Sequence, residues 1–425
     1  MVSELPSTYF LETLGCPKNQ VDSDKLEGTL TADGLQRVTS AEEADVVVVN
    51  TCAFIDEARA ESIDTILALA AQRRPGAELV VTGCLAERHG DELAAELPEI
   101  DRIAPFGAAL VSTPRIRPVP VSLGPTRRTP DFDLLNLPRP ASGRPWAYVK
   151  IAEGCDRACG FCAIPSFRGP QRSRSIEQIL AEVEQLRVCE VVLVAQDLAA
   201  YGRDQGVGER AIVPLVEQVA HRVDRVRLLY LHPSDLNDAL IDTICDTGVP
   251  YFDLSLQHVS PPLMRRMRRW GDGTRFLDRI EAIRHREPDA AFRSNFIVGY
   301  PGETEADHDA LLSFVEAAQL DWCGFFAYSP EPGTYAVELD GTVEPGLRDD
   351  RLAELRELQD EITATKRDLL VGSQVEVLVD EPGIGRSHRE APEIDGIIEV
   401  PTGLDVGTTH VLTVTAAMGP DLEAS

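Results

Sequence analysis

The sequence has no long apolar segment and few basic residues. No run approaches the ~18 apolar residues of a membrane-spanning helix. The opening residues, MVSELPSTYF, have neither the basic start nor the apolar stretch of a signal peptide. We therefore expect a cytoplasmic protein with no membrane partner. Lys and Arg number 41 against 70 Asp and Glu, a net charge of −29. This balance argues against a general nucleic-acid binder, because phosphate contacts need clustered basic side chains.

The acidic balance instead suits a basic partner, although many proteins are acidic for solubility alone. Hydrophobic residues make up 43% of the chain and charged residues 26%, which is ordinary for a globular protein. The 425 residues leave room for two to four domains and a large core.

A disulfide framework is also excluded, since cysteines in a reducing compartment stay largely unpaired. The nine cysteines divide into three groups. Three follow apolar runs near the N-terminus, three share one loop, and three fit no ligand group and are expected to be core or bystander residues. In that order they are Cys16, Cys52 and Cys84; Cys155, Cys159 and Cys162; and Cys189, Cys245 and Cys323.

Residues 1–110 repeat one pattern three times. In TYFLETLGC, ADVVVVNTC and AELVVTGC an apolar run ends in a cysteine, and a helical segment follows. Near-continuous valine runs are typical of parallel strands buried on both faces, so this alternation predicts a doubly wound α/β domain. We expect Asp22 to cap the first helix, Gly34 to end it, and a second helix to cover residues 55–74.

The pattern places Cys16, Cys52 and Cys84 just after the carboxyl ends of their strands. In an open α/β sheet this edge forms the ligand crevice. A single such cysteine is more often a small buried apolar residue. Three at equivalent positions favour a shared ligand.

The central region predicts a second α/β domain. Residues 114–145 are rich in proline and lack a sustained period, which indicates an interdomain connection. Strand–helix alternation returns over residues 146–327, with candidate strands AYVKIA, EVVLVAQ, VRLLYL, YFDLSLQ, FRSNFIVG and CGFFAYS. Six such units predict a partial (β/α)6 TIM-like barrel, whose functional side lies at the carboxyl ends of the strands.

The C-terminal region predicts a small antiparallel β-barrel after a charged helix over residues 348–370. SQVEVLVDEPG, DGIIEVPTG and THVLTVTAAMG have the pattern of short strands between Gly and Pro turns. Residues 368–425 hold 11 Asp and Glu, two Arg and no Lys, a formal charge of −9. We place the domains at 1–125, 146–365 and 366–425, with the connection at 126–145.

The stretch EGCDRACGFCAIPSFRG carries three thiols spaced C-x₃-C-x₂-C after the first central strand. A [4Fe–4S] cluster is usually held by four thiolates. Three thiolates leave one iron open to bind a substrate. This role explains why the loop carries three cysteines rather than four. A thioredoxin-type pair leaves Cys155 unexplained, and a zinc site lacks a fourth ligand close in sequence. The spacing favours the cluster.

This loop, with Phe161 before its last cysteine, resembles the radical S-adenosylmethionine (SAM) superfamily. The resemblance implies that the open iron binds the amino and carboxylate groups of SAM. It also implies that one electron, which an external donor must supply, cleaves the sulfonium bond to give a 5′-deoxyadenosyl radical.

TLGCPKNQVDSDKLEG, NTCAFIDEARAESID and VTGCLAER further resemble the N-terminal domain of the methylthiotransferase family. That resemblance implies an auxiliary [4Fe–4S] cluster on Cys16, Cys52 and Cys84. The C-terminal barrel resembles the TRAM domain of the same family.

GCPKNQVDS, EGCDRACGFCAIPSFRGPQRSRS and GRSHREAPEIDG resemble the RimO-type branch of this family. That branch modifies the β-carbon of an aspartate in the twelfth protein of the small ribosomal subunit. The tRNA-modifying branch usually carries GCQMN and PYTRG, which do not occur in this sequence. A C-terminal module of charge −9 also suits a basic ribosomal protein better than tRNA.

Two alternatives stay open: a tRNA methylthiotransferase, and a non-catalytic iron–sulfur carrier. The barrel argues against the carrier, which needs no SAM-sized cavity. The family resemblance implies two roles for SAM. One molecule donates a methyl group to sulfur at the auxiliary cluster, and a second supplies the radical. No acid or base catalyst is assigned.

Several residues at the expected barrel mouth are candidates for contact with SAM or substrate. The residues we assign to SAM are Phe161, Gln196, Asn295 and Gly299. Others, for which capping or structural roles are equally expected, are Asp197, His232, Gln257, His258, Gly302, Arg168 and Arg174. MRRMRR at 264–269 is expected to be a solvated helix face.

Overall fold

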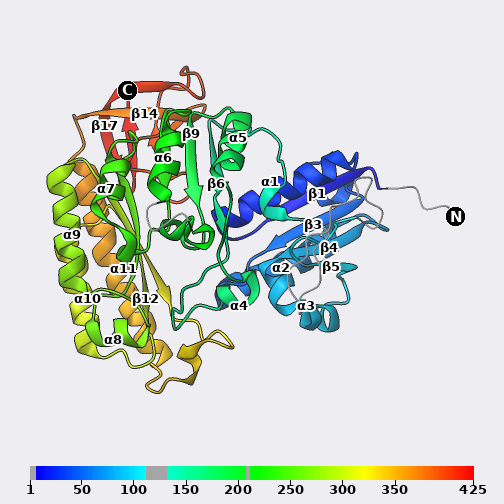
Figure 1. The fold of residues 1–425 in the computed structure, drawn as a ribbon, viewed down its shortest axis with the longest axis horizontal. Helices are drawn as coiled ribbons and strands as arrows, with labels where there is room; N and C mark the ends of the chain where they lie inside the picture. The colour runs from blue at the N-terminus through cyan, green and yellow to red at the C-terminus, as the bar shows by residue number, and fades with distance from the viewer. Residues whose placement is uncertain (1–5, 112–131, 207–210) are drawn as a thin grey trace. The chain divides into compact units, whose positions relative to one another are not determined.

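The chain forms two compact units in the computed structural model (Figure 1). The structure describes residues 6–111, 132–206 and 211–425. The two units are Met1–Ala141 with Ser166–Gly169, and Ser142–Pro165 with Pro170–Ser425. Part of the expected proline-rich connection, residues 114–131, lies outside the described residues.

The first unit is built on a parallel sheet in the order β2-β1-β3-β4-β5. The valines of β3 are at most 1% exposed, because helices cover both faces of the strand. The strand order reverses at β1, as in a doubly wound fold, so the expected architecture is confirmed. The elements are β1 (Thr8–Thr13), α1 (Pro17–Ala32), β2 (Gln36–Arg37), β3 (Val46–Thr51), α2 (Asp56–Gln72), β4 (Glu78–Gly83), α3 (Cys84–Glu96) and β5 (Arg102–Ala104).

Helix α1 begins earlier than expected. Pro17 occupies its first turn and Cys16 is its N-cap residue, because the fixed φ of proline suits the start of a helix. The expectation that Asp22 caps the helix is therefore wrong, since Asp22 lies inside α1 and is buried. Gly34 follows the end of the helix with a φ of +85°, a conformation that suits glycine.

The second unit contains the expected partial barrel. Its six parallel strands follow one another in chain order, and a bridge between Leu231 and Leu254 joins the two halves of the sheet. The strands are β6 (Trp146–Lys150), β9 (Glu190–Val194), β10 (Arg225–Leu228), β11 (Tyr251–Gln257), β12 (Ala291–Val298) and β13 (Trp322–Ala327). The helices between them are α4 (Ile164–Arg168), α5 (Ile176–Leu186), α6 (Ile212–Ala220), α7 (Asp238–Cys245), α8 (Pro261–Arg266), α9 (Gly273–Arg286) and α10 (Glu305–Ala318).

Helix α11 (Pro345–Asp368) packs against β13 and leads into a closed five-stranded barrel. Most strand pairs of this barrel are antiparallel, but β16 and β18 pair in parallel. Its strands are β14 (Gln374–Glu381), β15 (Ile384–Arg386), β16 (Ile398–Glu399), β17 (Thr409–Met418) and β18 (Asp421–Ala424). Across the described ranges, no helix is both long and apolar enough to cross a membrane.

Residues 386–395 of the C-terminal barrel cover the amino end of the central barrel. Glu190, at the start of β9, is fully buried and pairs with Arg227 at 2.8 Å and Arg386 at 3.2 Å. Their positive charges hold the pKa of Glu190 at about 2 although burial opposes this. Side chains near the starts of four strands also bond to this segment, namely Tyr148, Arg227, Tyr251 and Trp322. The GRSHREAPEIDG stretch therefore has a structural role here.

Candidate functional site

The first unit brings three cysteines to the carboxyl edge of its sheet. Cys16 lies three residues beyond β1, Cys52 directly follows β3, and Cys84 is the first residue of α3. The loops that carry them are in contact, because a Cβ atom on Gly15 would lie 2.9 Å from Cys52 Sγ. Strands β1, β3 and β4 are neighbours in the sheet, and this order explains why cysteines far apart in sequence gather here.

Asn19 ties the loops of this edge together. Its Nδ2 donates to the carbonyl oxygens of Leu14 and Thr51, each at 3.0 Å. Its Oδ1 accepts from Arg168 at 2.8 Å and lies 3.6 Å from Cys84 Sγ. Asn19 is not among the site residues predicted from the sequence. Its place three residues after Cys16, in the first turn of α1, was the available signal.

Arg168 is the charged group beside these thiols. Its side chain is 3% exposed, and Nη2 donates to Cys84 Sγ at 3.0 Å. Nη1 donates to Asp22 at 3.2 Å, and the guanidinium carbon lies 4.4 Å from the centre of the Phe106 ring. The sequence leaves two possible partners for Arg168, namely SAM and an iron–sulfur cluster. Its contact with the Cys84 thiol favours the cluster.

The three thiols differ in acidity. Burial raises the pKa of Cys16, but Lys18, Arg168 and backbone amides outweigh it, so the net pKa is lowered. Burial raises the pKa of Cys52 to about 12, with repulsion from the other two thiols adding to it. Burial also raises the pKa of Cys84, against the opposing charge of Arg168. Coupling among all three thiols indicates that they share one local environment.

The second unit holds the other three cysteines in the loop after β6. The ends of this loop are joined by the short strands β7 (Ala152–Glu153) and β8 (Arg172–Ser173). Within the loop, Gly160 donates to the carbonyl of Met267 and accepts from Ala336, each at 2.8 Å. A Cβ atom on Gly160 would lie 2.8 Å from the Tyr300 hydroxyl. This close approach requires glycine at position 160.

Nitrogen donors face two of the loop sulfurs. The backbone amide of Arg157 donates to Cys155 Sγ, and Nη1 of Arg269 donates to Cys159 Sγ, both at 3.4 Å. Burial raises the pKa of Cys155 to about 11 and that of Cys162 to about 12. Such thiols lose their protons when they bind a metal.

The expectation that residues 264–269 form a solvated helix face is wrong in part. Met264 and Met267 are buried in the core beside α8. Arg268 stacks on Tyr335, and Arg269 reaches the cysteine loop. The helix ends at Arg266. Arg268 and Arg269 therefore lie beyond it and do not share a helix face with the other arginines.

Gln196 lies at the carboxyl end of β9 beside the cysteine loop. Its Nε2 donates to Glu153 at 2.6 Å, and Glu153 also pairs with Lys150 at 2.7 Å. Oε1 of Gln196 is buried without a hydrogen-bond partner among the described residues. This spare acceptor fits a ligand with an ammonium group, as SAM has. Asp197 instead pairs with Arg157 at 2.5 Å.

The other mouth residues are mainly fixed by protein contacts. Burial lowers the pKa of His232 to about 2 and that of His258 to about 4, with nearby charges modifying each shift. Both rings are therefore neutral near pH 7. The Nδ1 atom of each accepts from the backbone amide two residues on. Gln257 has a φ of +73° at the end of β11, where non-glycine residues are uncommon.

The remaining candidates lie in protein contacts as well. The Asn295 amide oxygen, in its favoured orientation, accepts from Arg293 at 3.2 Å. Phe161 packs against an apolar group that includes Tyr300. A Cβ atom on Gly299 would lie 2.5 Å from Arg348 Cγ. Arg174 is structural, since it pairs with Glu182 at 2.7 Å. The roles of Phe161, Gln196, Asn295 and Gly299 in binding SAM stay predictions.

Gly302 adjoins a side chain too, since a Cβ atom there would lie 2.9 Å from the Arg266 guanidinium. Cys189 donates to the carbonyl of Gly407 at 3.2 Å, and Cys245 and Cys323 pack against the barrel core.

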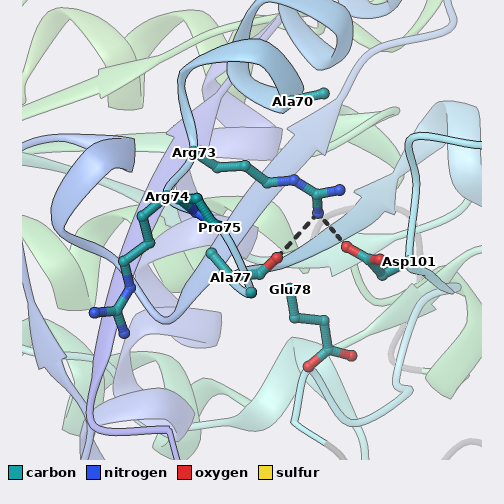
Figure 2. A pocket seen from close by; sticks show the side chains of 8 residues that line it. Ala70, Arg73, Arg74, Pro75, Ala77, Glu78 and Asp101 are labelled. Atoms are coloured by element: carbon teal, nitrogen blue, oxygen red, sulfur yellow. Dashed lines mark hydrogen bonds and ion pairs between the residues drawn. The ribbon is translucent and has the colours of Figure 1, made fainter.

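Figure 2 shows a hollow that contains none of these candidates. It lies where α2 ends and β4 begins, and Arg73 reaches across it to the carbonyl of Ala77 and to Asp101. Cys84 follows the other end of β4, so the hollow is separate from the cysteine edge. Across the described part of the chain, the two cysteine groups included, no three Cys, His, Asp or Glu side chains are grouped closely enough to hold a single metal ion. The ligand roles of the six cysteines therefore stay predictions from donor type and placement.

Three family models match successive parts of the chain. Residues 8–105 match Uncharacterized protein family UPF0004, residues 149–315 match the Radical SAM superfamily, and residues 371–425 match the TRAM domain. A solved structure of the radical SAM methyltransferase TsrM from Kitasatospora setae shares the fold. It is 13% identical with a TM-score of 0.51, over 84% of this chain and 89% of that one. Fold and matches together define a radical SAM protein with a C-terminal TRAM domain.

Relatives that match nearly the whole chain show which family of radical SAM proteins it belongs to. A protein of Kineococcus radiotolerans is 42% identical over 97% of this chain and 96% of its own length. One from Chloroflexus aurantiacus is 41% identical, over 97% and 98%. Both are named ribosomal protein uS12 methylthiotransferase RimO, and this chain belongs to the RimO family. Membership of the radical SAM superfamily implies SAM and a [4Fe–4S] cluster as cofactors.

Proposed function

We propose that this chain transfers a methylthio group to the β-carbon of an aspartate in ribosomal protein uS12. One observation carries the proposal. In a chain of the RimO family, two groups of three cysteines lie at the carboxyl ends of strands in two separate parallel sheets. A single radical SAM cluster needs only one such group. We place the reaction in the cytoplasm, because the substrate is a ribosomal protein.

The two groups have different tasks in this proposal. Cys155, Cys159 and Cys162 hold the radical SAM cluster, and the residues Cys16, Cys52 and Cys84 hold a second [4Fe–4S] cluster. When bound, these groups supply radical chemistry and sulfur transfer, with SAM as both methyl donor and radical source. An external donor supplies the electron. The protein orients the thiols and excludes water from them.

Polar and apolar groups at the barrel mouth would hold SAM. The spare acceptor on Gln196 and the carboxylate of Glu153 suit its ammonium group. Phe161 supplies apolar contact, and Gly299, beside the Arg348 side chain, is assigned as a backbone contact. Asn295 supplies an amide whose oxygen accepts from Arg293 and whose NH₂ group donates to the carbonyl of Ser294. We assign the second N–H of that group to the ligand.

The C-terminal barrel would meet the substrate protein. Several of its carboxylates are neutralised inside the molecule, as in the pairs Glu390–Arg367 and Asp380–Arg386. Seven acidic residues of the region are exposed, whereas Arg386 is buried and Arg389 is half-buried. The surface charge of this module is therefore acidic and suits a basic protein. The exposed acids are Asp368, Glu376, Glu381, Glu393, Glu399, Asp405 and Glu423.

The test is a competition between two substrates. The protein is reconstituted anaerobically with iron and sulfide, then given SAM, dithionite and sulfide. A peptide of the aspartate-bearing uS12 loop and unmodified tRNA are offered together, and mass spectrometry identifies which gains a methylthio group. We expect the gain on the aspartate. A gain on tRNA would overturn the substrate, and the absence of 5′-deoxyadenosine would overturn the radical chemistry itself.

A further inference from the structure

Arg168 lies where it can act on a ligand sulfur rather than on a substrate. Its buried guanidinium donates to Cys84 Sγ at 3.0 Å and to Asn19 Oδ1 at 2.8 Å from the same Nη2 atom. The opposite nitrogen donates to Asp22 at 3.2 Å, and the Phe106 ring lies against one face at 4.4 Å. All of these residues belong to the first unit. The surroundings hold the guanidinium in one orientation.

We propose that Arg168 is a positioning residue for the second cluster and raises its reduction potential. The inference rests on the proposed function, because it needs a cluster on Cys16, Cys52 and Cys84. Hydrogen bonds to ligand sulfurs and nearby charge are among the factors that set the potential of an iron–sulfur cluster. An N–H donor and a positive charge both stabilise the more negative, reduced form. Asp22 moderates this effect, because its carboxylate partly offsets the charge of Arg168.

The geometry also explains why arginine is needed at this position. The guanidinium bonds to Cys84 and Asn19 on one side and to Asp22 on another, through nitrogens fixed in one plane. A lysine ammonium is a single point donor on a flexible stem and does not reproduce this fork. Asn19 in turn holds the loops after β1 and β3. Arg168 therefore fixes the Cys84 sulfur relative to the other two cysteine loops.

The experiment isolates the second cluster in the full-length chain. Cys155, Cys159 and Cys162 are replaced by Ala, and the remaining cluster is reconstituted and titrated with dithionite while its EPR signal is followed. We expect Arg168→Gln to shift the midpoint to lower potential, Arg168→Lys to give a smaller shift, and Asp22→Asn to shift it upward. Arg73→Gln is the matched control, because Arg73 bonds to a carbonyl and a carboxylate at the other end of β4. Its midpoint potential should equal that of the parent, which is the chain with only Cys155, Cys159 and Cys162 replaced.

Each outcome decides the proposal. An unchanged midpoint in Arg168→Gln overturns it and leaves the proposed function intact. If Arg168→Gln binds too little iron to titrate, Arg168→Lys and Asp22→Asn decide, and unchanged midpoints in both overturn it. If the parent with Cys16, Cys52 and Cys84 intact binds no cluster, the second-cluster part of the proposed function fails and this inference fails with it.

Discussion

The two cysteine groups are built in different ways. Cys155, Cys159 and Cys162 lie within eight residues of sequence, and local backbone bonds through Gly160 shape their loop. Cys16, Cys52 and Cys84 span nearly seventy residues and meet because β1, β3 and β4 are neighbours in one sheet. One group depends on a turn and the other on a topology. Mutations that disturb one should therefore leave the other largely intact.

The electrostatic surroundings of the two groups also differ. Each has an arginine beside one sulfur, Arg269 at 3.4 Å from Cys159 and Arg168 at 3.0 Å from Cys84. Arg168 is buried with a carboxylate partner, whereas Arg269 also bonds to the backbone carbonyl of Ser255. A buried charge requires a compensating charge, which Asp22 provides. The sheet-edge group is thus the more closed of the two environments.

The largest effect should come from removing one thiol of each group. We expect Cys159→Ala to abolish 5′-deoxyadenosine formation, because the radical SAM cluster loses a ligand. Cys52→Ala should retain 5′-deoxyadenosine formation and lose methylthiolation, because only the second cluster is affected. Chromatography of nucleoside products and mass spectrometry of the uS12 peptide measure the two effects. Equal loss of 5′-deoxyadenosine in both variants would contradict the independence of the groups.

A change at the amino end of the central barrel tests whether that end serves stability while the carboxyl end, with its cysteine loop, serves the reaction. Glu190→Gln leaves buried arginines without their counter-charge, so we expect a loss of about 3–5 kcal/mol in the free energy of unfolding of the second unit. Denaturant unfolding of the cluster-free protein measures it. Glu184→Gln is the control, because Glu184 is 62% exposed in its pair with Arg222 and should contribute at most about 1 kcal/mol.

The same residue predicts a pH dependence. The folded pKa of Glu190 is about 2, below the ordinary value of 4.5. Its stabilising contribution is therefore present above pH 4.5 and is lost as the pH falls toward 2. Glu190→Gln should show a smaller loss of stability over this window than the parent. An identical pH profile would mean that the Glu190 carboxylate contributes nothing to acid sensitivity.

The sequence patterns predicted elements better than contacts between them. Valine runs and strand–helix alternation identified the parallel sheet and all six central strands, because both signals are local. They did not predict that Arg168 meets Cys84 or that residues 386–395 cover the central barrel. These contacts join residues 84 and about 160 positions apart, and no periodicity encodes which buried arginine meets which partner. Asp22 shows the same limit. Aspartate is a common helix cap, which is what the sequence predicts, but this side chain is buried inside α1 and pairs with Arg168.

A glycine substitution should have a smaller effect confined to the sheet edge. Gly83 has a φ of +92°, and a Cβ atom there would lie 2.5 Å from the Thr51 carbonyl oxygen and close to Asn50 Oδ1. We expect Gly83→Ala to lower the free energy of unfolding of the first unit by about 1–3 kcal/mol and to reduce iron at the second cluster. Gly76→Ala is the control, with a φ of +87° but no atom within 4 Å. If both substitutions cost the same, backbone strain alone explains the loss and the packing between the Cys52 and Cys84 loops contributes nothing.

The smallest effect should come from a cysteine outside both groups. Cys245 ends α7 and packs at the edge of the barrel core, far in sequence from either group. Since free cysteine commonly acts as a small apolar residue, Cys245→Ala should change the free energy of unfolding by less than about 1 kcal/mol. Iron content, measured beside Cys52→Ala, should equal that of the parent. A loss of iron in Cys245→Ala would mean that this thiol supports a cluster, and the division into one loop group and one sheet-edge group would then be incomplete.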